Sequence, residues 1–281
     1  MHALDQGFHN IETDCQLSAD EIPVNIHGEV LEKTTNGSGG VSSHTVDELQ
    51  RLDAGSWFSS EFAGQRIPLL SEVLVLLAGA HLHLELKFKQ PLLPTRVVEA
   101  LRAAGYIPSA AAQLGHLQSS PAESTGRDLE GAEPRTQASD GAATSAGCRI
   151  EGRGTFGVPG LTITSFHLDQ LQRSLKLLPH VRHAWLVQEL DDGVLATAAA
   201  AAAAAGTAPL QLCPRANACT AEGVAAALSR GHSVRGWGVR SIEDLDRLRA
   251  CGAHGCTVDW PDVARRHILE NPCVGTGTAS C

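Results

Sequence analysis

The sequence predicts an α/β fold of the (β/α)₈ barrel class. Segments with the alternation of a strand and segments with helical spacing follow one another along the chain, which is typical of a parallel sheet covered by helices. Nearly eight such units fit within the 281 residues. No Gly-x-Gly-x-x-Gly follows a predicted strand, which disfavours an open dinucleotide-binding sheet.

The first part of the chain supplies short strands and amphipathic helices in turn. Residues 81–87 alternate strictly, with leucine at every second position and polar side chains between, so we expect the leucine face to pack against helices. Thr45 stands three residues before Glu48, the spacing of a helix capping box, and Gly105 ends a helix. The expected strands are residues 11–15, 23–27 and 81–87, and the expected helices are 45–53, 70–78 and 94–104.

The second part repeats this rhythm. Eight consecutive alanines, Ala198–Ala205, predict a surface helix because alanine has the highest helix propensity. The expected strands are residues 161–166, 183–187, 210–212, 234–239 and 255–258, and the other expected helices are 168–177, 221–229 and 242–251.

A tract of different composition separates the two parts. Residues 107–160 are rich in Ser, Ala, Gly, Pro and Thr and have no apolar period, and such a length is unusual for a loop of a compact domain. We interpret residues 1–281 as one barrel domain that this disordered surface insertion interrupts. The alternative is a linker between two domains.

The composition excludes some classes of protein. The chain carries 31 acidic and 22 basic residues, a net charge of −9, and only 4% aromatic residues, which argues against a nucleic-acid partner. No apolar stretch is long enough for a transmembrane segment, so we expect a soluble protein of the cytoplasm or an organelle lumen. The cysteines form no Cys-x-x-Cys, which favours free thiols.

Polar side chains on two predicted strands could carry chemistry. Glu12 and Asp14 are two residues apart and so share one face of a strand, and Glu85 and Lys87 share a face in the same way. Three converging carboxylates suit a hard divalent cation such as Mg²⁺ or Ca²⁺, and the alternative is a solvated strand end. His27 closes the second predicted strand and suits either proton transfer or a buried structural role.

The combination of segments resembles the glycerophosphodiester phosphodiesterase family. The segments that carry the resemblance are, in order, Asp5-Gln-Gly-Phe-His-Asn-Ile-Glu-Thr-Asp14, Ile22-Pro-Val-Asn-Ile-His27, Leu31-Glu-Lys-Thr-Thr-Asn-Gly-Ser-Gly-Gly-Val41, Leu52-Asp-Ala-Gly-Ser-Trp-Phe58, Phe62-Ala-Gly-Gln-Arg-Ile-Pro68, Leu84-Glu-Leu-Lys87, Ser165-Phe166, Trp237-Gly-Val239 and Gly255-Cys-Thr-Val-Asp-Trp-Pro-Asp262. They span nearly the whole chain outside the insertion.

The resemblance implies a (β/α)₈ barrel that uses a divalent cation, Mg²⁺ or Ca²⁺, to hydrolyse a glycerophosphodiester to glycerol 3-phosphate and an alcohol. It implies three metal ligands, one catalytic acid or base and two residues that bind the substrate. These are Glu12, Asp14 and Glu85 for the metal, His27 for catalysis, and Lys87 and Trp237 for the substrate. Core packing is the alternative role for Trp237.

Two departures from the family pattern change the expected activity. The printed sequence contains no His-Arg-Gly, the end of the family's first strand, so we expect a barrel lacking that strand at its N-terminus. Gly28 stands where the family has Asp after the histidine. We therefore expect this chain to have little or no phosphodiesterase activity. The alternative functions are a non-catalytic barrel remnant that binds metal or phosphodiester, and a fragment of a longer enzyme.

Overall fold

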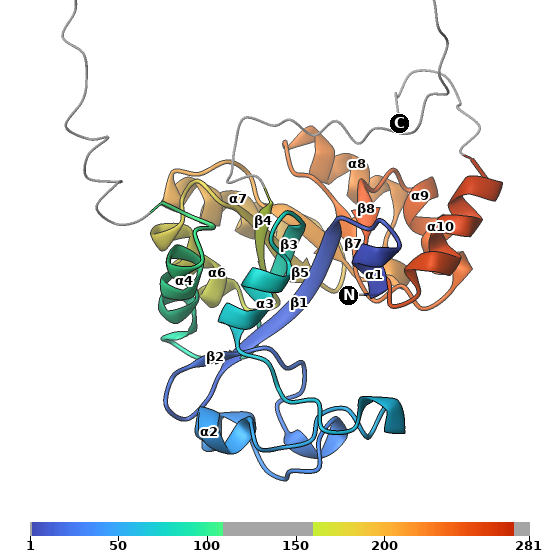
Figure 1. Ribbon diagram of the computed structural model, residues 1–281. Coiled ribbons are helices and arrows are strands. Elements are labelled where there is room, and N and C mark those ends of the chain that lie inside the picture. Colours follow the sequence, from blue (N-terminus) through green and yellow to red (C-terminus); the bar gives the residue numbers. More distant parts are fainter. Residues whose placement is uncertain (1, 109–159, 273–281) are drawn as a thin grey trace, which may run out of the picture. The chain divides into compact units, whose positions relative to one another are not determined.

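The computed structural model describes residues 2–108 and 160–272, and the strands of this part run alongside one another within a layer of helices (Figure 1). Residues 2–107 and 160–272 belong to one compact unit. The predicted insertion, residues 107–160, lies almost wholly outside the described residues.

Parallel strands form the centre of the fold, as the sequence predicts. Five of them pair side by side in the order β1 (Asn10–Leu17), β3 (His81–Leu86), β4 (Leu161–Ser165), β5 (Arg182–Val187) and β6 (Gln211–Pro214). A further parallel pair consists of β7 (Arg235–Gly236) and β8 (Gly255–Cys256). Single bridges, Leu212 with Val234 and Arg215 with Trp237, continue the order from β6 to β7.

Helices alternate with these strands. They are α1 (His2–Asp5), α2 (Val46–Leu49), α3 (Leu70–Leu76), α4 (Leu93–Ala103), α6 (Leu168–Leu177), α7 (Asp192–Ala205), α8 (Ala221–Ser229), α9 (Ile242–Ala250) and α10 (Pro261–Glu270). Asp191, Thr220 and Ser241 accept backbone N–H groups at the starts of α7, α8 and α9, and the predicted capping box of Thr45 and Glu48 opens α2. None of these helices is long and apolar enough to span a membrane.

The strand register separates a core face from a polar face. Glu12 of β1 lies beside His83 of β3, and Asp14 lies beside Glu85, so their side chains share the inner face of the sheet. The leucines at 82, 84 and 86 point the other way, are fully buried and pack with apolar residues of α3, α4 and α6. The predicted division of residues 81–87 is therefore confirmed.

The second predicted strand is wrong in length and role. β2 contains only Pro23–Val24 and pairs antiparallel with the end of β1, so it is not one of the parallel strands. Beyond Val24, the side chain of Asn25 donates hydrogen bonds to the Thr13 hydroxyl and to the Asp14 carbonyl, and the backbone ladder stops there. Residues 25–69 then form a long segment outside the sheet, which contains α2 and has a small hydrophobic core of its own (Figure 1). His27 consequently lies in a bend.

The sheet is open at one edge in the described part of the chain. Residues 2–108 and 160–272 form no ladder between β8 and β1. The outer layer nevertheless continues across this edge, because Arg265 of α10 donates to the Gln6 carbonyl after α1, at 2.9 Å, and lies over the ring of Phe8. The expectation that the family's first strand is lacking stays a prediction.

A buried histidine on β5 predicts a loss of stability in acid. His183 donates from Nδ1 to the Val181 carbonyl and accepts at Nε2 from the Ser174 hydroxyl, an arrangement that suits the neutral ring. Burial lowers the pKa of His183 from 6.5 to about 4. Between pH 6.5 and 4 this histidine is protonated in the unfolded chain but stays neutral in the folded chain. Its contribution therefore lowers the free energy of unfolding by roughly 3 kcal/mol as the pH falls through this range.

The measurement is urea unfolding at several pH values for the parent and for His183→Gln. The variant is expected to be less stable than the parent near neutrality. Below pH 6.5, however, its free energy of unfolding should fall less steeply than that of the parent. An identical slope in both proteins would show that His183 does not carry this dependence.

Candidate functional site

Three carboxylates meet on the inner face of β1 and β3. One carboxylate oxygen from each of Glu12, Asp14 and Glu85 lies within 4.8 Å of the other two. The strand pairing explains this meeting, since Asp14 stands directly beside Glu85 in the register. β1 is longer than the predicted strand of residues 11–15 and continues to Leu17, so Asp14 lies three residues before its end.

Lys87 lies against this carboxylate cluster. It follows the last residue of β3, and its Nζ is 2.9 Å from Glu85 Oε1 and 3.4 Å from Asp14 Oδ1. Its side chain is only 11% exposed. Burial alone would lower the pKa of Lys87, but the carboxylates of Glu85 and Asp14 outweigh that effect and raise it. A single ammonium thus balances part of the negative charge of three carboxylates.

The cluster has the electrostatics of a cation site. Burial, followed by the charges of Asp14 and Glu85, raises the pKa of Glu12 from 4.5 to about 8. Burial likewise raises the pKa of Glu85, although Lys87 opposes the change. Carboxylates that are this crowded repel one another, and oxygen ligands are those that hard divalent cations prefer. The residues present therefore fit such a cation.

The structure does not bring His27 into the carboxylate cluster. Its side chain is exposed and makes no hydrogen bond with any other described residue. Its backbone is fixed, however, because Gln16 donates from Nε2 to the carbonyls of Ile26 and Gly28, at 3.0 and 2.7 Å. Gln16 lies two residues beyond Asp14 on β1 and is 1% exposed. It connects the cluster strand to the His27 bend, and sequence patterns gave no signal of this role.

We expect Gln16→Leu to loosen that bend. The buried carbonyl of Ile26 and the partly buried carbonyl of Gly28 would both lose their partner, and leaving a buried acceptor unpaired typically costs about 1–3 kcal/mol. Hydrogen exchange should therefore accelerate at residues 26–29, and the free energy of unfolding should fall. Gln172→Leu on the exposed face of α6 is the control. Unchanged exchange at residues 26–29 in Gln16→Leu would contradict the proposed fixation.

Trp237 lies at the carboxyl end of β7. Its indole N–H donates to the Val187 carbonyl at 2.8 Å, and the Phe166 ring meets it edge-on with centroids 4.8 Å apart. Trp237 also packs against a small buried cluster that contains Leu186 and Cys213. The residue is half-buried, so it contributes to core packing and still presents part of its ring at the strand ends.

Sequence reasoning missed Arg235 and His83. Arg235 is 8% exposed, donates to the Thr257 hydroxyl, and has no hydrogen-bond partner at Nε. Its charge acts against the raised pKa of Glu12, which places it beside the carboxylate cluster. His83 is equally buried, and its Nδ1 has no partner among the described residues. The alternation of residues 81–87 could have indicated that His83 shares a face with Glu85. The two-residue step from Arg235 to Trp237 could likewise have indicated that these two side chains share a face.

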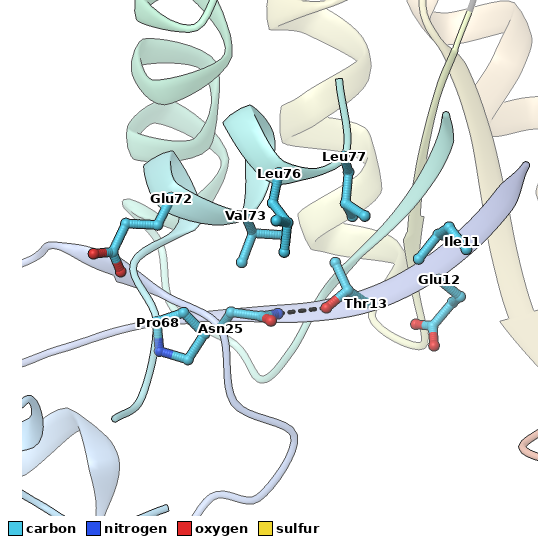
Figure 2. A pocket seen from close by; sticks show the side chains of 9 residues that line it. All are labelled: Ile11, Glu12, Thr13, Asn25, Pro68, Glu72, Val73, Leu76 and Leu77. Atoms are coloured by element: carbon cyan, nitrogen blue, oxygen red, sulfur yellow. Dashed lines mark hydrogen bonds between the residues drawn. The ribbon is translucent and has the colours of Figure 1, made fainter. Parts of the chain in front are cut away.

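A cavity of about 370 Å³ lies on the other side of β1. Figure 2 shows Ile11 and Thr13 on the side of α3, where Val73, Leu76 and Leu77 face them, whereas the Glu12 carboxylate points to the opposite side of the strand. The cavity walls are mostly apolar; Glu12 lines the cavity, but Asp14 and Glu85 do not. Because the Glu12 carboxylate points away from α3, the cavity and the carboxylate cluster lie on opposite faces of β1.

Comparison with known proteins identifies relatives across the chain. Residues 1–101 match the model of the glycerophosphoryl diester phosphodiesterase family. A glycerophosphodiester phosphodiesterase of Bacillus altitudinis is 28% identical over 272 residues, which cover 94% of this chain and 87% of that protein. One of Caldanaerobacter subterraneus is 41% identical over 87 residues, covering 31% of this chain and 36% of that protein.

Solved structures have the same fold. A phosphodiesterase of Oleispira antarctica, solved in complex with sn-glycerol 3-phosphate, matches with a TM-score of 0.69 and 22% identity over 95% of this chain and 88% of that chain. A glycerophosphodiester phosphodiesterase of Agrobacterium tumefaciens matches with a TM-score of 0.62 and 20% identity over 94% and 90%. The predicted barrel class is thereby confirmed.

The shorter matches, which are more identical in sequence, span only 26–36% of the relatives' own lengths. The family match, residues 1–101, includes the carboxylate cluster, and the Bacillus altitudinis relative and the solved structures extend the likeness over nearly all of the chain. The chain is therefore similar to glycerophosphodiester phosphodiesterases over nearly all of its length, and residues 1–101 match the family's model.

Proposed function

We propose that this chain performs cation-dependent hydrolysis of a glycerophosphodiester to glycerol 3-phosphate and an alcohol. The observation that carries the proposal is the meeting of Glu12, Asp14 and Glu85 within 4.8 Å on the barrel's inner face. A divalent cation held there, Mg²⁺ or Ca²⁺, would supply charge neutralisation at the non-bridging oxygens of the phosphodiester.

The chain's own residues would perform the remaining tasks. Lys87 is already held beside the carboxylate cluster, and its ammonium can bind a phosphate oxygen once a cation satisfies Glu85 and Asp14. His27, whose backbone Gln16 fixes, would exchange a proton with the attacking water or the leaving oxygen. Trp237 would contact the alcohol part of the substrate at the strand ends.

A second candidate function is binding of metal or phosphodiester without turnover. It is favoured by one observation: His27 is exposed and makes no hydrogen bond with the described residues, so no neighbouring group fixes the orientation of its ring for proton transfer.

The test is release of glycerol 3-phosphate from glycerophosphodiesters by the purified chain, with Mg²⁺ or Ca²⁺ and with EDTA. Cation-dependent release that is lost in Glu85→Gln and Lys87→Met supports hydrolysis. Cation binding without release supports the second candidate function. A chain that releases no glycerol 3-phosphate and binds neither the cation nor a glycerophosphodiester would contradict both.

A further inference from the structure

Arg215 places a second positive charge at the strand ends, apart from Lys87. It follows β6 directly, and Trp237 follows β7 directly, and the two residues are bridge partners. The Arg215 guanidinium lies 5.7 Å from the centre of the Trp237 ring. An arginine stacked in this way keeps its N–H groups free to bind in the plane of the guanidinium.

The backbone fixes this pair from both sides. Trp237 N donates to the Pro214 carbonyl at 3.0 Å, and Ala216 N donates to the Trp237 carbonyl at 2.9 Å. Arg215 N donates to the carbonyls of Val187 and Gln188 at the end of β5. These hydrogen bonds fix the backbone of both Arg215 and Trp237. The position of the guanidinium over the ring therefore does not depend on the stacking contact alone.

No carboxylate among residues 2–108 and 160–272 pairs with Arg215. The described ion pairs all involve other cations, and the guanidinium has no hydrogen-bond partner there. Glu189, which follows β5, is exposed and forms no ion pair with it. The charge on Arg215 is therefore not neutralised within the described part of the site.

We propose that Arg215 selects substrates whose alcohol part carries an anionic group, a carboxylate or a further phosphate. The inference rests on the proposed function and assigns the substrate class of that site. The alcohol part would lie at Trp237, where the guanidinium can form charge-assisted hydrogen bonds with a planar carboxylate or a phosphate. A quaternary ammonium group is disfavoured, because Arg215 covers one face of the ring and repels a second cation.

The matched probes are glycerophosphoserine and glycerophosphoethanolamine, which differ only by one carboxylate. Their Kd values are measured by calorimetry in EDTA, where turnover does not intervene, and their kcat/KM values are measured with Mg²⁺ or Ca²⁺. We expect the parent to favour the serine diester at least about tenfold, the range of a charge-assisted hydrogen bond. Arg215→Gln should reduce this ratio to about one, and Arg215→Lys should retain part of it.

The control is Arg173→Gln on α6, which removes one exposed positive charge and should leave the ratio unchanged. An unchanged ratio in Arg215→Gln would overturn the proposal, because a merely structural arginine would weaken both diesters equally. Equal parent affinity for both diesters would overturn it too. Selective binding without turnover supports the role of Arg215 and contradicts hydrolysis. Turnover without selectivity supports hydrolysis and contradicts the role of Arg215.

Discussion

Replacing Glu85 by glutamine is expected to weaken divalent-cation binding by about 100-fold or more, because one of three charged ligands is lost. The change keeps the size of the side chain and its place on β3. It also removes one of the mutually repelling carboxylates that raise the pKa of Glu12, so we expect the fold to be retained. Calorimetric titration of Mg²⁺ and Ca²⁺ into both proteins measures the difference.

The control for this charge removal is Glu222→Gln on the exposed surface of α8, which should leave cation affinity unchanged. If Glu85→Gln binds both ions as tightly as the parent does, the cation site is wrongly placed.

Leu84→Ala, one residue away on the same strand, is expected to have the opposite profile. Leu84 is fully buried in the core cluster that α3 and α4 share with β3, and a cavity of this kind costs about 3–4 kcal/mol. Its side chain points away from the carboxylate cluster, so cation affinity of the folded protein should change little. Urea unfolding and calorimetric titration together test both parts.

Leu76→Ala on α3 provides the matched comparison. Leu76 is 51% exposed, so the same truncation should cost less than about 1 kcal/mol. A loss of stability in Leu84→Ala no larger than in Leu76→Ala would contradict the assignment of the leucine face to the core.

The alternation of residues 81–87 was enough to predict both β3 and the division between Leu84 and Glu85. A period of two residues leaves only one choice of inner face once leucines occupy the other. The meeting of Glu85 with Glu12 and Asp14 followed from the resemblance and from the convergence of parallel strands. The structure adds the register that places Asp14 beside Glu85.

Other contacts could not be predicted from local patterns. Gln16 donates to the backbone of the His27 bend, and Arg215 lies over Trp237, its partner in a parallel bridge. Both contacts depend on how segments separated in sequence pair in the fold. The second strand ended early because the Asn25 side chain, rather than the backbone, binds β1. When a side-chain hydrogen bond replaces a backbone hydrogen bond of the ladder, the alternation of polar and apolar residues does not reveal it.

The most direct test of the cation site is a crystal structure of the chain soaked with Mn²⁺, with the ion located by its anomalous scattering. The account predicts one strong peak among the carboxylates of Glu12, Asp14 and Glu85, with Lys87 Nζ moved away from the position it holds 2.9 Å from Glu85. A cluster without that peak, with Lys87 still paired to Glu85 and Asp14 at saturating Mn²⁺, would contradict it.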